Sequence, residues 1–304
     1  MSGSAGSNGS VDHAANKEVQ SGTVKQTDHI CRVLHRSTSH PSVCLSLGSF
    51  QLSMYLLTAE ENDRISYHKC DLSDEQEIAA VCGKIRSEFG HPTVLVNNAG
   101  LSRGRTIVEG TYSDNNITLK TNLLAPFLLS REFLPTMICR NHGHIFNIAS
   151  MSAYIPAPGL ADYAASKAGL IAFHECLSQE LRVQNRPKVR TSLAVLGFTK
   201  TPLFKGETNQ SQFLMPVLHV DTVVDAIVDT LDSGLSQTIF LPGIFGLFAG
   251  LVSSLFFEAG LPLTDFQRGA PDWFQNLVRS GTKSLKVDFK GRQEIDPETG
   301  RLVR

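Results

Sequence analysis

The chain has 304 residues, of which 41% are hydrophobic, and a formal net charge of −1. This length and apolar content suit one large α/β domain with short appendages. The balanced charge and the lack of a long basic run argue against nucleic-acid binding.

The six cysteines and ten histidines lack the spacings of a disulfide framework or a metal site. No two cysteines form a C-x-x-C pair, which is typical of a reducing compartment and mostly buried thiols. His142 and His144 are the nearest pair of potential ligands, but they enter an apolar run with no third ligand beside them. We therefore expect no metal cofactor.

The amino-terminal residues 1–42 are polar, rich in Ser, Gly and His, and show no sustained periodicity. This composition predicts disorder, and the lack of an apolar core in residues 1–22 argues against a signal peptide. Residues 43–57 are more apolar but match no clean template. We expect the folded domain to cover residues 43–242, followed by an apolar helix and a charged tail over 243–304.

Alternating strands and helices are predicted from residue 65 onward. The expected strands cover residues 65–68, 93–97, 144–149, 189–196 and 237–241. The expected helices cover residues 73–89, 114–140, 161–183 and 220–232. The first helix is expected to have Ser73 as its cap, Gln76 at capping-box spacing and Gly90 at its end. This order predicts an α/β fold, a doubly wound parallel sheet (Rossmann-like), in which ligands bind beyond the carboxyl ends of the strands.

Tyr163 and Lys167 are the first candidates for chemistry, because a spacing of four places both on one helix face. An ammonium beside a phenol favours the phenolate and lowers its pKa, so the tyrosine can exchange protons with an alcohol or carbonyl. The alternative is an ordinary pair on a solvated helix face.

Ser150 ends the strand 144–149, thirteen residues before Tyr163. A hydroxyl there can hydrogen-bond a substrate oxygen and hold it against the tyrosine. The alternative role is a turn or cap serine, which is common after a strand.

Three further polar sites allow both a functional and a structural interpretation. Asn97 to Gly100 could border a flat ligand or form a simple turn. Asp71 could accept a hydrogen bond from an adenine or belong to the helix start. Asn122 is a poor residue for a helix interior, so it predicts a kink or water site, or else a polar side chain packed between helices.

Taken together, these residues resemble the short-chain dehydrogenase/reductase family over about residues 64–241. The resemblance implies that Tyr163 is the general acid/base, Lys167 lowers its pKa and binds the nicotinamide ribose, Ser150 orients the substrate, and Asn122 holds a relay water. It implies a cofactor, NAD or NADP with NADP slightly favoured, and a homodimer. The implied cofactor-binding residues are Asp71, Asn97, Ala99, Gly100, Lys167, Gly197, Thr199 and Thr201.

The family's glycine-rich turn after the first strand is not found upstream of Asp71. Glycines and a helix N-terminus normally cradle the pyrophosphate there. Gly3, Gly6 and Gly9 are rejected, because no strand precedes them and no apolar helix follows. The first β-α unit is therefore expected to be atypical, and a catalytically inactive binding or scaffold protein remains the alternative to an enzyme.

Residues 233–257 carry no charge and are strongly apolar from residue 244. The stretch that remains after the last strand is too short for a bilayer core of about 30 Å, so peripheral membrane contact through residues 243–257 is expected. A substrate lid or a dimer contact is the alternative. The apolar tail resembles the retinol dehydrogenase-like branch, which implies a lipophilic alcohol or carbonyl (a retinoid, sterol or fatty chain) and a place on the cytoplasmic face of an intracellular membrane or in the cytoplasm.

Overall fold

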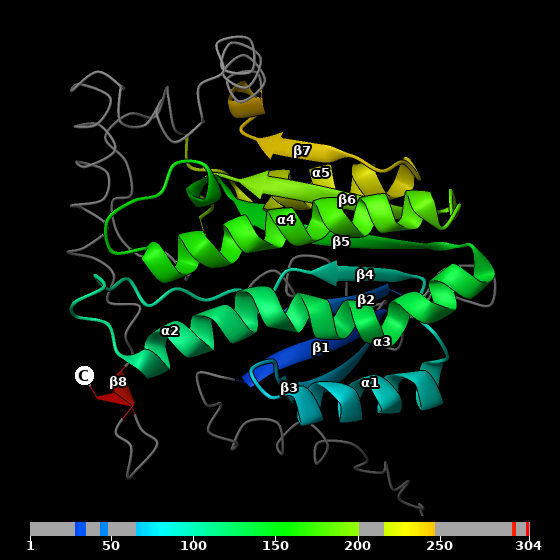
Figure 1. Ribbon diagram of the computed structural model, residues 1–304, viewed down its shortest axis with the longest axis horizontal. Coiled ribbons are helices and arrows are strands. Elements are labelled where there is room, and N and C mark those ends of the chain that lie inside the picture. The colour runs from blue at the N-terminus through cyan, green and yellow to red at the C-terminus, as the bar shows by residue number, and fades with distance from the viewer. Residues whose placement is uncertain are drawn as a thin grey trace, which may run out of the picture.

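A seven-stranded sheet forms the centre of the protein (Figure 1). The computed structural model describes residues 28–34, 43–47, 65–200, 216–246, 294–295 and 302–303. The strands in this sheet are β1 (Asp28–Leu34), β2 (Val43–Leu47), β3 (Ile65–Asp71), β4 (Val94–Asn97), β5 (Gly143–Ser150), β6 (Val189–Leu196) and β7 (Thr238–Leu241). Their spatial order is β3-β1-β2-β4-β5-β6-β7, and a separate pair of two-residue strands, β8 (Glu294–Ile295) and β9 (Leu302–Val303), lies outside it.

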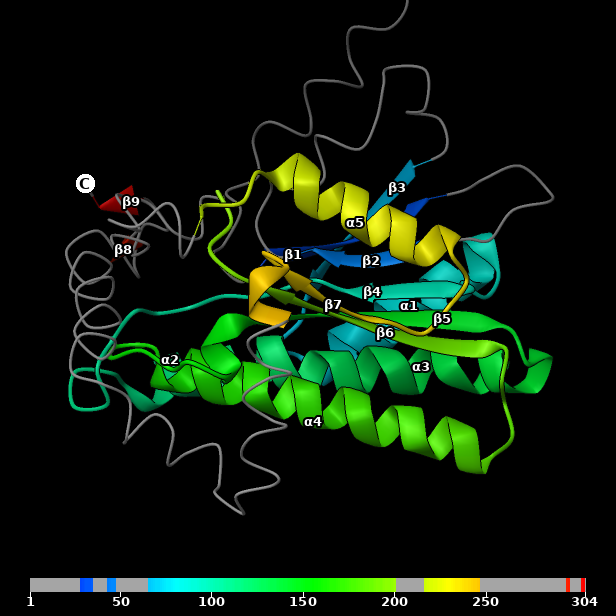
Figure 2. The same cartoon turned by 90° about the horizontal axis from the view of Figure 1, so that it is seen from above.

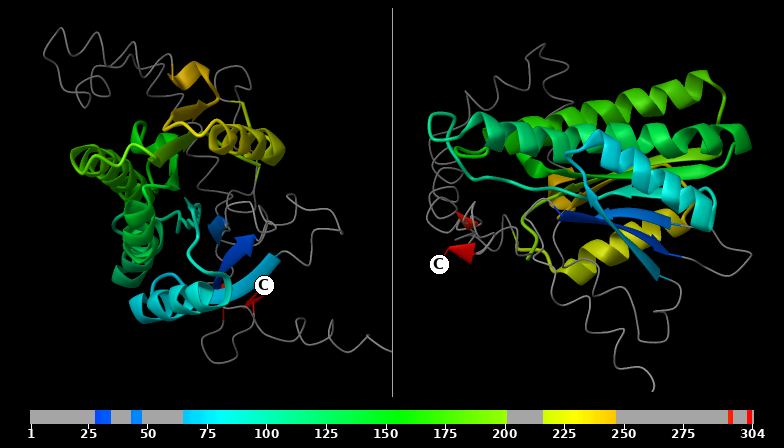
Figure 3. Two further views of the ribbon diagram at one scale, coloured as in Figure 1. Left: turned by 90° about the vertical axis from the view of Figure 1, so that its right-hand side faces the viewer. Right: turned by 90° about the horizontal axis from the view of Figure 1, so that it is seen from below.

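Helices cover both faces of the sheet, as Figure 2 shows with α5 on one face and α3 and α4 on the other. The α-helices are α1 (Glu75–Phe89), α2 (Tyr112–Leu119), α3 (Ala125–Arg140), α4 (Ala161–Val183) and α5 (Val220–Asp232). A π-helical turn, η3 (Lys120–Leu124), joins α2 to α3, and a short 3-10 turn, η4 (Met151–Ala153), follows β5. α1 packs beside α3 (Figure 3). The predicted doubly wound α/β class is confirmed.

The first β unit differs from the rest of the sheet. β2 and β4 to β7 run parallel, whereas β1 is antiparallel to both of its neighbours, β2 and β3. β1 lies within the residues 1–42 for which the sequence predicts disorder, so the sheet begins before the predicted boundary at residue 43. The structure therefore has the atypical first unit that the missing glycine run indicates.

The start of α1 corrects the predicted cap. Asp74, not Ser73, is the N-cap residue, and its carboxylate accepts the backbone N–H groups of Gln76 and Glu77. The backbone N–H and the hydroxyl of Ser73 both donate to the Asp71 carboxylate, at 2.8 and 2.7 Å. A charged acceptor at the positive end of a helix is favoured over a neutral hydroxyl, which explains the shift by one residue.

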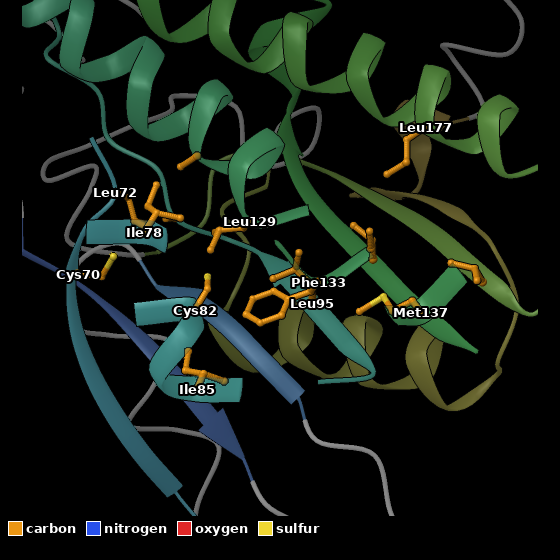
Figure 4. Packing of buried hydrophobic residues seen from close by; sticks show 14 of the residues in the cluster. Cys70, Leu72, Ile78, Cys82, Ile85, Leu95, Leu129, Phe133, Met137 and Leu177 are labelled. Atoms are coloured by element: carbon orange, nitrogen blue, oxygen red, sulfur yellow. The ribbon is translucent and has the colours of Figure 1, made fainter. Parts of the chain in front are cut away.

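Two apolar layers fix the sheet between its helices. The larger cluster joins α1, α3 and α4 to β4 and β5 around Phe133, Leu129 and Leu95, as Figure 4 shows. The smaller cluster packs Val223 and Ile227 of α5 against the opposite face of the sheet. Because both faces are covered, the central strands carry the continuous apolar runs that the sequence displays.

The apolar segment expected to touch a membrane falls mostly outside the described residues. Only residues 243–246 of the stretch 243–257 are described, and Ile244 is exposed there. Among the described residues, no helix combines the length and the hydropathy that a membrane crossing requires.

Candidate active site

The carboxyl ends of β4, β5 and β6 meet at one edge of the sheet, and the candidate residues gather there. β5 ends at Ser150, which pairs with Leu196 at the end of β6. The Ser150 hydroxyl accepts the backbone N–H of Ser152 at 3.2 Å, so this serine also serves as the turn residue of the alternative interpretation. The two roles coexist, because a hydroxyl can donate one hydrogen bond and accept two.

Tyr163 lies in the first turn of α4 and is buried. Burial raises the pKa of the phenol, and a hydrogen bond with the Ser150 side chain acts in the opposite direction and lowers it. The structure thus joins the serine and the tyrosine, which the sequence separates by thirteen residues. The phenol is protonated in this environment, the form that donates a proton.

Lys167 follows one turn later on the same face of α4. Its ammonium nitrogen lies 5.8 Å from the centre of the Tyr163 ring and donates to the main-chain oxygen of Ile148 at 2.8 Å. Burial lowers the pKa of this amine to about 8. Of its three N–H groups, one is accepted by Ile148, so donors remain for a ligand.

Asn122 lies inside η3 and binds the segment that leaves β4. Its side-chain oxygen accepts the Leu101 N–H, while its amide nitrogen donates to the Leu101 carbonyl and to the Ser166 hydroxyl, all within 2.9 to 3.0 Å. These bonds use both N–H groups of the Asn122 amide. The predicted kink is present as a π-helical turn.

The main-chain carbonyl of Asn122 cannot accept the usual hydrogen bond of a regular helix. In a regular helix that carbonyl accepts the N–H four residues later, but residue 126 is a proline, which has none. The Asn122 amide already bonds Leu101 and Ser166, so its N–H groups are not available to a relay water.

Gly100 brings the β4 segment close to the lysine. A Cβ atom added at Gly100 would lie 3.4 Å from the Lys167 amine and 3.7 Å from the Asn122 side-chain oxygen. Asn97 donates to the Asn147 side chain on β5 at 2.8 Å, so it bridges neighbouring strand ends as expected, and Ala99 is buried in the core. Backbone close to the amine is thus available to a flat ligand.

The remaining cofactor candidates take mainly local roles. Asp71 is bonded within its own turn to Ser73. Gly197 donates its N–H to Leu241 at 2.7 Å, and a Cβ there would lie 3.2 Å from Pro242. The Thr199 hydroxyl contacts the Gly197 carbonyl at 3.4 Å, and Thr201 lies outside the described residues.

A nicotinamide cofactor fits one half of this edge better than the other. The buried Lys167 ammonium with spare donors, beside Gly100 and Tyr163, suits the ribose and nicotinamide. On the other side, β2 occupies the strand position next to β4, with Ser46 opposite Asn97. The sequence after β2 contains Gly48 and then no glycine before Gly83, so it lacks the run that cradles a pyrophosphate.

No metal site accompanies these groups. The described residues contain no cluster of three or more potential metal ligands. His144 instead hydrogen-bonds the Ser192 hydroxyl at 2.8 Å, in the strand where the sequence places it. Of the four cysteines whose side chains the structure describes, Cys70 and Cys82 are buried while Cys139 and Cys176 are exposed, so the expectation of mostly buried thiols holds for half of them.

Sequence reasoning missed Asn147, Ser166 and His174, which the structure connects to the candidate residues. Ser166 links Asn122 to the Tyr163 carbonyl, and Asn147 links Asn97 to His174. A polar residue inside the apolar run of β5 was the available signal for Asn147. His174 follows Lys167 by seven residues, two helical turns, which places both on one face.

Comparisons with known proteins identify the family of the chain. The family profile described as short chain dehydrogenase matches residues 30–212. "Dehydrogenase RED3" of Cochliobolus heterostrophus is 43% identical over 131 residues, covering 43% of this chain and 67% of that protein. "Epidermal retinol dehydrogenase 2" of Mus musculus is 29% identical over 205 residues, covering 67% of this chain and 65% of that protein.

The chain thus spans about two thirds of the length of these relatives. A solved metagenomic short-chain oxidoreductase in complex with NADP is 30% identical, with a TM-score of 0.45 over 57% of this chain and 71% of that chain. The mouse relative confirms the likeness to the retinol dehydrogenase-like branch. The profile match, which covers more than half of the residues, shows that the chain belongs to the short-chain dehydrogenase family of oxidoreductases.

Proposed function

We propose that this chain is an NAD(P)-dependent oxidoreductase that interconverts an alcohol and a carbonyl on a lipophilic substrate. The observation that carries the proposal is the arrangement of Ser150 with the buried Tyr163 and Lys167 at the carboxyl edge of the sheet. The serine and tyrosine share a hydrogen bond, and the amine lies one helical turn from the phenol.

Each side chain has a distinct part in this chemistry. The nicotinamide, when bound, supplies or accepts the hydride. Ser150 hydrogen-bonds the substrate oxygen and holds it beside the phenol, and Tyr163 gives a proton to that oxygen in reduction or takes one in oxidation. Lys167 binds the ribose hydroxyls through the donors that Ile148 leaves free. Its positive charge, while present, favours the phenolate.

The ionisation of Tyr163 predicts how the rates of reduction and oxidation depend on pH. Burial keeps the phenol protonated, so carbonyl reduction is favoured near neutral pH. Alcohol oxidation requires the phenolate and therefore increases as pH rises. The retinol dehydrogenase-like relatives support a lipophilic substrate, such as a retinoid, a sterol or a fatty-chain compound.

Turnover of NADH and NADPH with retinal and long-chain aldehydes tests the proposal. We expect wild-type activity to fall by about 10²-fold to 10⁴-fold in Tyr163→Phe, because a general acid contributes about that much. Cofactor binding, followed by nicotinamide fluorescence, should survive in the variant. Equal inactivity of both proteins, each shown to be folded, would remove the enzyme assignment.

A catalytically inactive binding protein is the second candidate function. It is favoured by the missing glycine run and by the reversed strand β1. Titration with NADH and NADPH separates the two, since submicromolar binding of either cofactor excludes a protein that has lost its dinucleotide site. Absence of binding up to millimolar concentrations supports the second candidate.

A homodimer through α2, η3 and α3 is also proposed. Tyr112, Leu119, Leu124 and Phe127 are exposed, and their spacing, with the wider π turn, places them along one side of this helix. The Phe127 ring lies 4.1 Å from that of Phe173 on α4, which extends the apolar surface. Phe127→Glu should yield a monomer in analytical ultracentrifugation, and an unchanged dimer would exclude this face.

Peripheral membrane contact is proposed for the segment 243–257, with the cytoplasmic face of the endoplasmic reticulum or a lipid droplet as its place. The uncharged apolar sequence from residue 244 and the retinol dehydrogenase-like relatives support it. Flotation with phosphatidylcholine vesicles should retain the full chain and lose a Phe248→Asp, Leu251→Asp double variant. If both proteins stay unbound, the segment does not contact lipid.

A further inference from the structure

Three buried polar side chains connect β4 and β5 to α4 through hydrogen bonds. The Asn97 amide nitrogen on β4 donates to the Asn147 side-chain oxygen on β5 at 2.8 Å. The Asn147 amide nitrogen contacts the His174 Nδ1 atom on α4 at 3.3 Å. All three residues are at most 7% exposed, so each lost hydrogen bond carries the cost of burial.

The order of donors fixes the state of the histidine. Asn147 uses its oxygen to accept from Asn97, which leaves its amide N–H groups for His174. His174 Nδ1 must then be an acceptor, so the imidazole is neutral and carries its proton on Nε2. Burial supports this state, because it lowers the pKa of His174 to about 4.

The same two elements meet again at the catalytic lysine. Ile148, the residue after Asn147, accepts the Lys167 ammonium at 2.8 Å through its main-chain oxygen. Lys167 and His174 are two turns apart on one face of α4. α4 is therefore attached to β5 at two successive strand residues, once through a side chain and once through the backbone.

We propose that His174 is a positioning residue: as a neutral acceptor for Asn147 it holds α4 in the register on β5 that places Lys167 against the Ile148 carbonyl. The catalytic relevance of this role rests on the proposed function, whereas the geometric claim does not. Loss of the acceptor leaves a buried donor on Asn147 and loosens the contact between β5 and α4. Water then reaches the Lys167 amine. The Asn122 and Tyr163 side chains surround this amine, and burial, not a charged neighbour, is the cause that lowers its pKa.

The test is an NMR titration of the Lys167 amine in the full chain, with turnover measured alongside. Burial is the cause that lowers this pKa to about 8, so hydration in His174→Leu should move it upward toward its usual value near 10.5. We expect kcat/KM to fall about tenfold in the same variant. His174→Gln offers a neutral acceptor of similar reach and should restore both quantities.

His144→Leu is the matched control. His144 is equally buried, has its pKa lowered to about 4 by burial, and bonds Ser192 at the opposite end of β5. This control should lower the thermal midpoint without moving the Lys167 pKa. If His174→Leu fails to fold, Asn147→Ser shortens the side chain so that it no longer reaches His174, and it is expected to give the same upward movement.

The outcomes separate the two claims. An unchanged Lys167 pKa in His174→Leu or Asn147→Ser, or an equal movement in His144→Leu, overturns the positioning role. If the Lys167 pKa moves in His174→Leu but the wild type neither binds NADH or NADPH nor turns over substrate, the geometry is supported and the proposed function is rejected. Movement of the pKa together with the loss in kcat/KM supports both.

Discussion

The carboxyl ends of β2 and of β4 to β6 lie along one edge of the sheet, yet they supply very different groups. The ends of β4 and β5, with α4 and η3 behind them, provide a buried amine, a phenol, a hydroxyl and an amide connected by hydrogen bonds. Beside β2 stands a strand that runs the opposite way, and its sequence surroundings lack the expected glycines.

Under the proposed function, this difference assigns proton handling and dinucleotide affinity to separate regions of the fold. The first would depend on the packing of β4 on β5, of α4 on β5 and of α4 on η3. The second depends also on the unit around β1 and β2. The chain can therefore keep the catalytic arrangement while its affinity for the adenosine half of a cofactor is altered. The predictions below test how independent the two regions are.

Of the three tests that follow, Lys167→Met is expected to have the largest effect on activity. Removing the buried amine should lower kcat/KM by about 10²-fold or more, because ribose binding and the positive charge beside Tyr163 are lost. Cofactor affinity should fall as well, in contrast to Tyr163→Phe, which leaves the ribose contacts intact. Steady-state kinetics and fluorescence titration of the two variants give the comparison. If the two variants have equal cofactor affinity, the β4–β5 region does not carry the ribose contact.

Acid should destabilise the parallel half of the sheet. The folded-state pKa values of His144 and His174 are about 4, below the usual 6.5, so the unfolded chain binds protons first as pH falls. Stability is therefore complete above pH about 6.5 and declines until pH about 4, by up to about 3 kcal/mol for each histidine. Urea unfolding at several pH values measures this decline. The His144→Leu variant should remove part of it, and a flat profile between pH 7 and 4.5 would contradict the prediction.

The smallest effect is expected from Gly100→Ala. The added Cβ would lie 3.4 Å from the Lys167 amine, at the edge of ordinary contact, so kcat/KM should fall about threefold to tenfold with little change in stability. Gly83→Ala is the control, since its Cβ in α1 meets only the end of Arg86 at 3.9 Å. It should stabilise the chain by about 0.5 to 1 kcal/mol and leave activity unchanged. Equal activity of the two variants would show that activity does not require the space beside Lys167 that Gly100 leaves open.

Most helices and strands from β4 onward could be predicted, because each has one clear apolar periodicity. The bounds of α4, β6 and α5 agree with the predicted ranges, since apolar periodicity and the end residues indicate the same limits. The predicted helix over 114–140 is divided by η3, and Asn122 with Pro126 was the signal. The cap moved from Ser73 to Asp74 because two neighbouring acceptors competed for one helix start.

The first unit and the buried polar chain could not be predicted from local patterns. β1 and β2 pair antiparallel, but residues 35–42 between them contain no glycine and no two-residue hairpin turn, so the pairing could not be predicted. The partnership of Asn147 with His174 joins residues 27 apart, and only the packing of α4 on β5 brings them together. The four candidates Asn122, Ser150, Tyr163 and Lys167 were identifiable because their order along the chain resembles that of the family.

The π-helical turn η3 affects two separate parts of the molecule. A π-helical turn amounts to one extra residue, so deleting it would rotate α2 by about 100° relative to α3. That rotation would carry Tyr112 and Leu119 away from the line of Leu124 and Phe127, and would withdraw the Asn122 amide from Leu101. A substitution that relaxes this turn would therefore change the exposed apolar line and the Asn122 contact together.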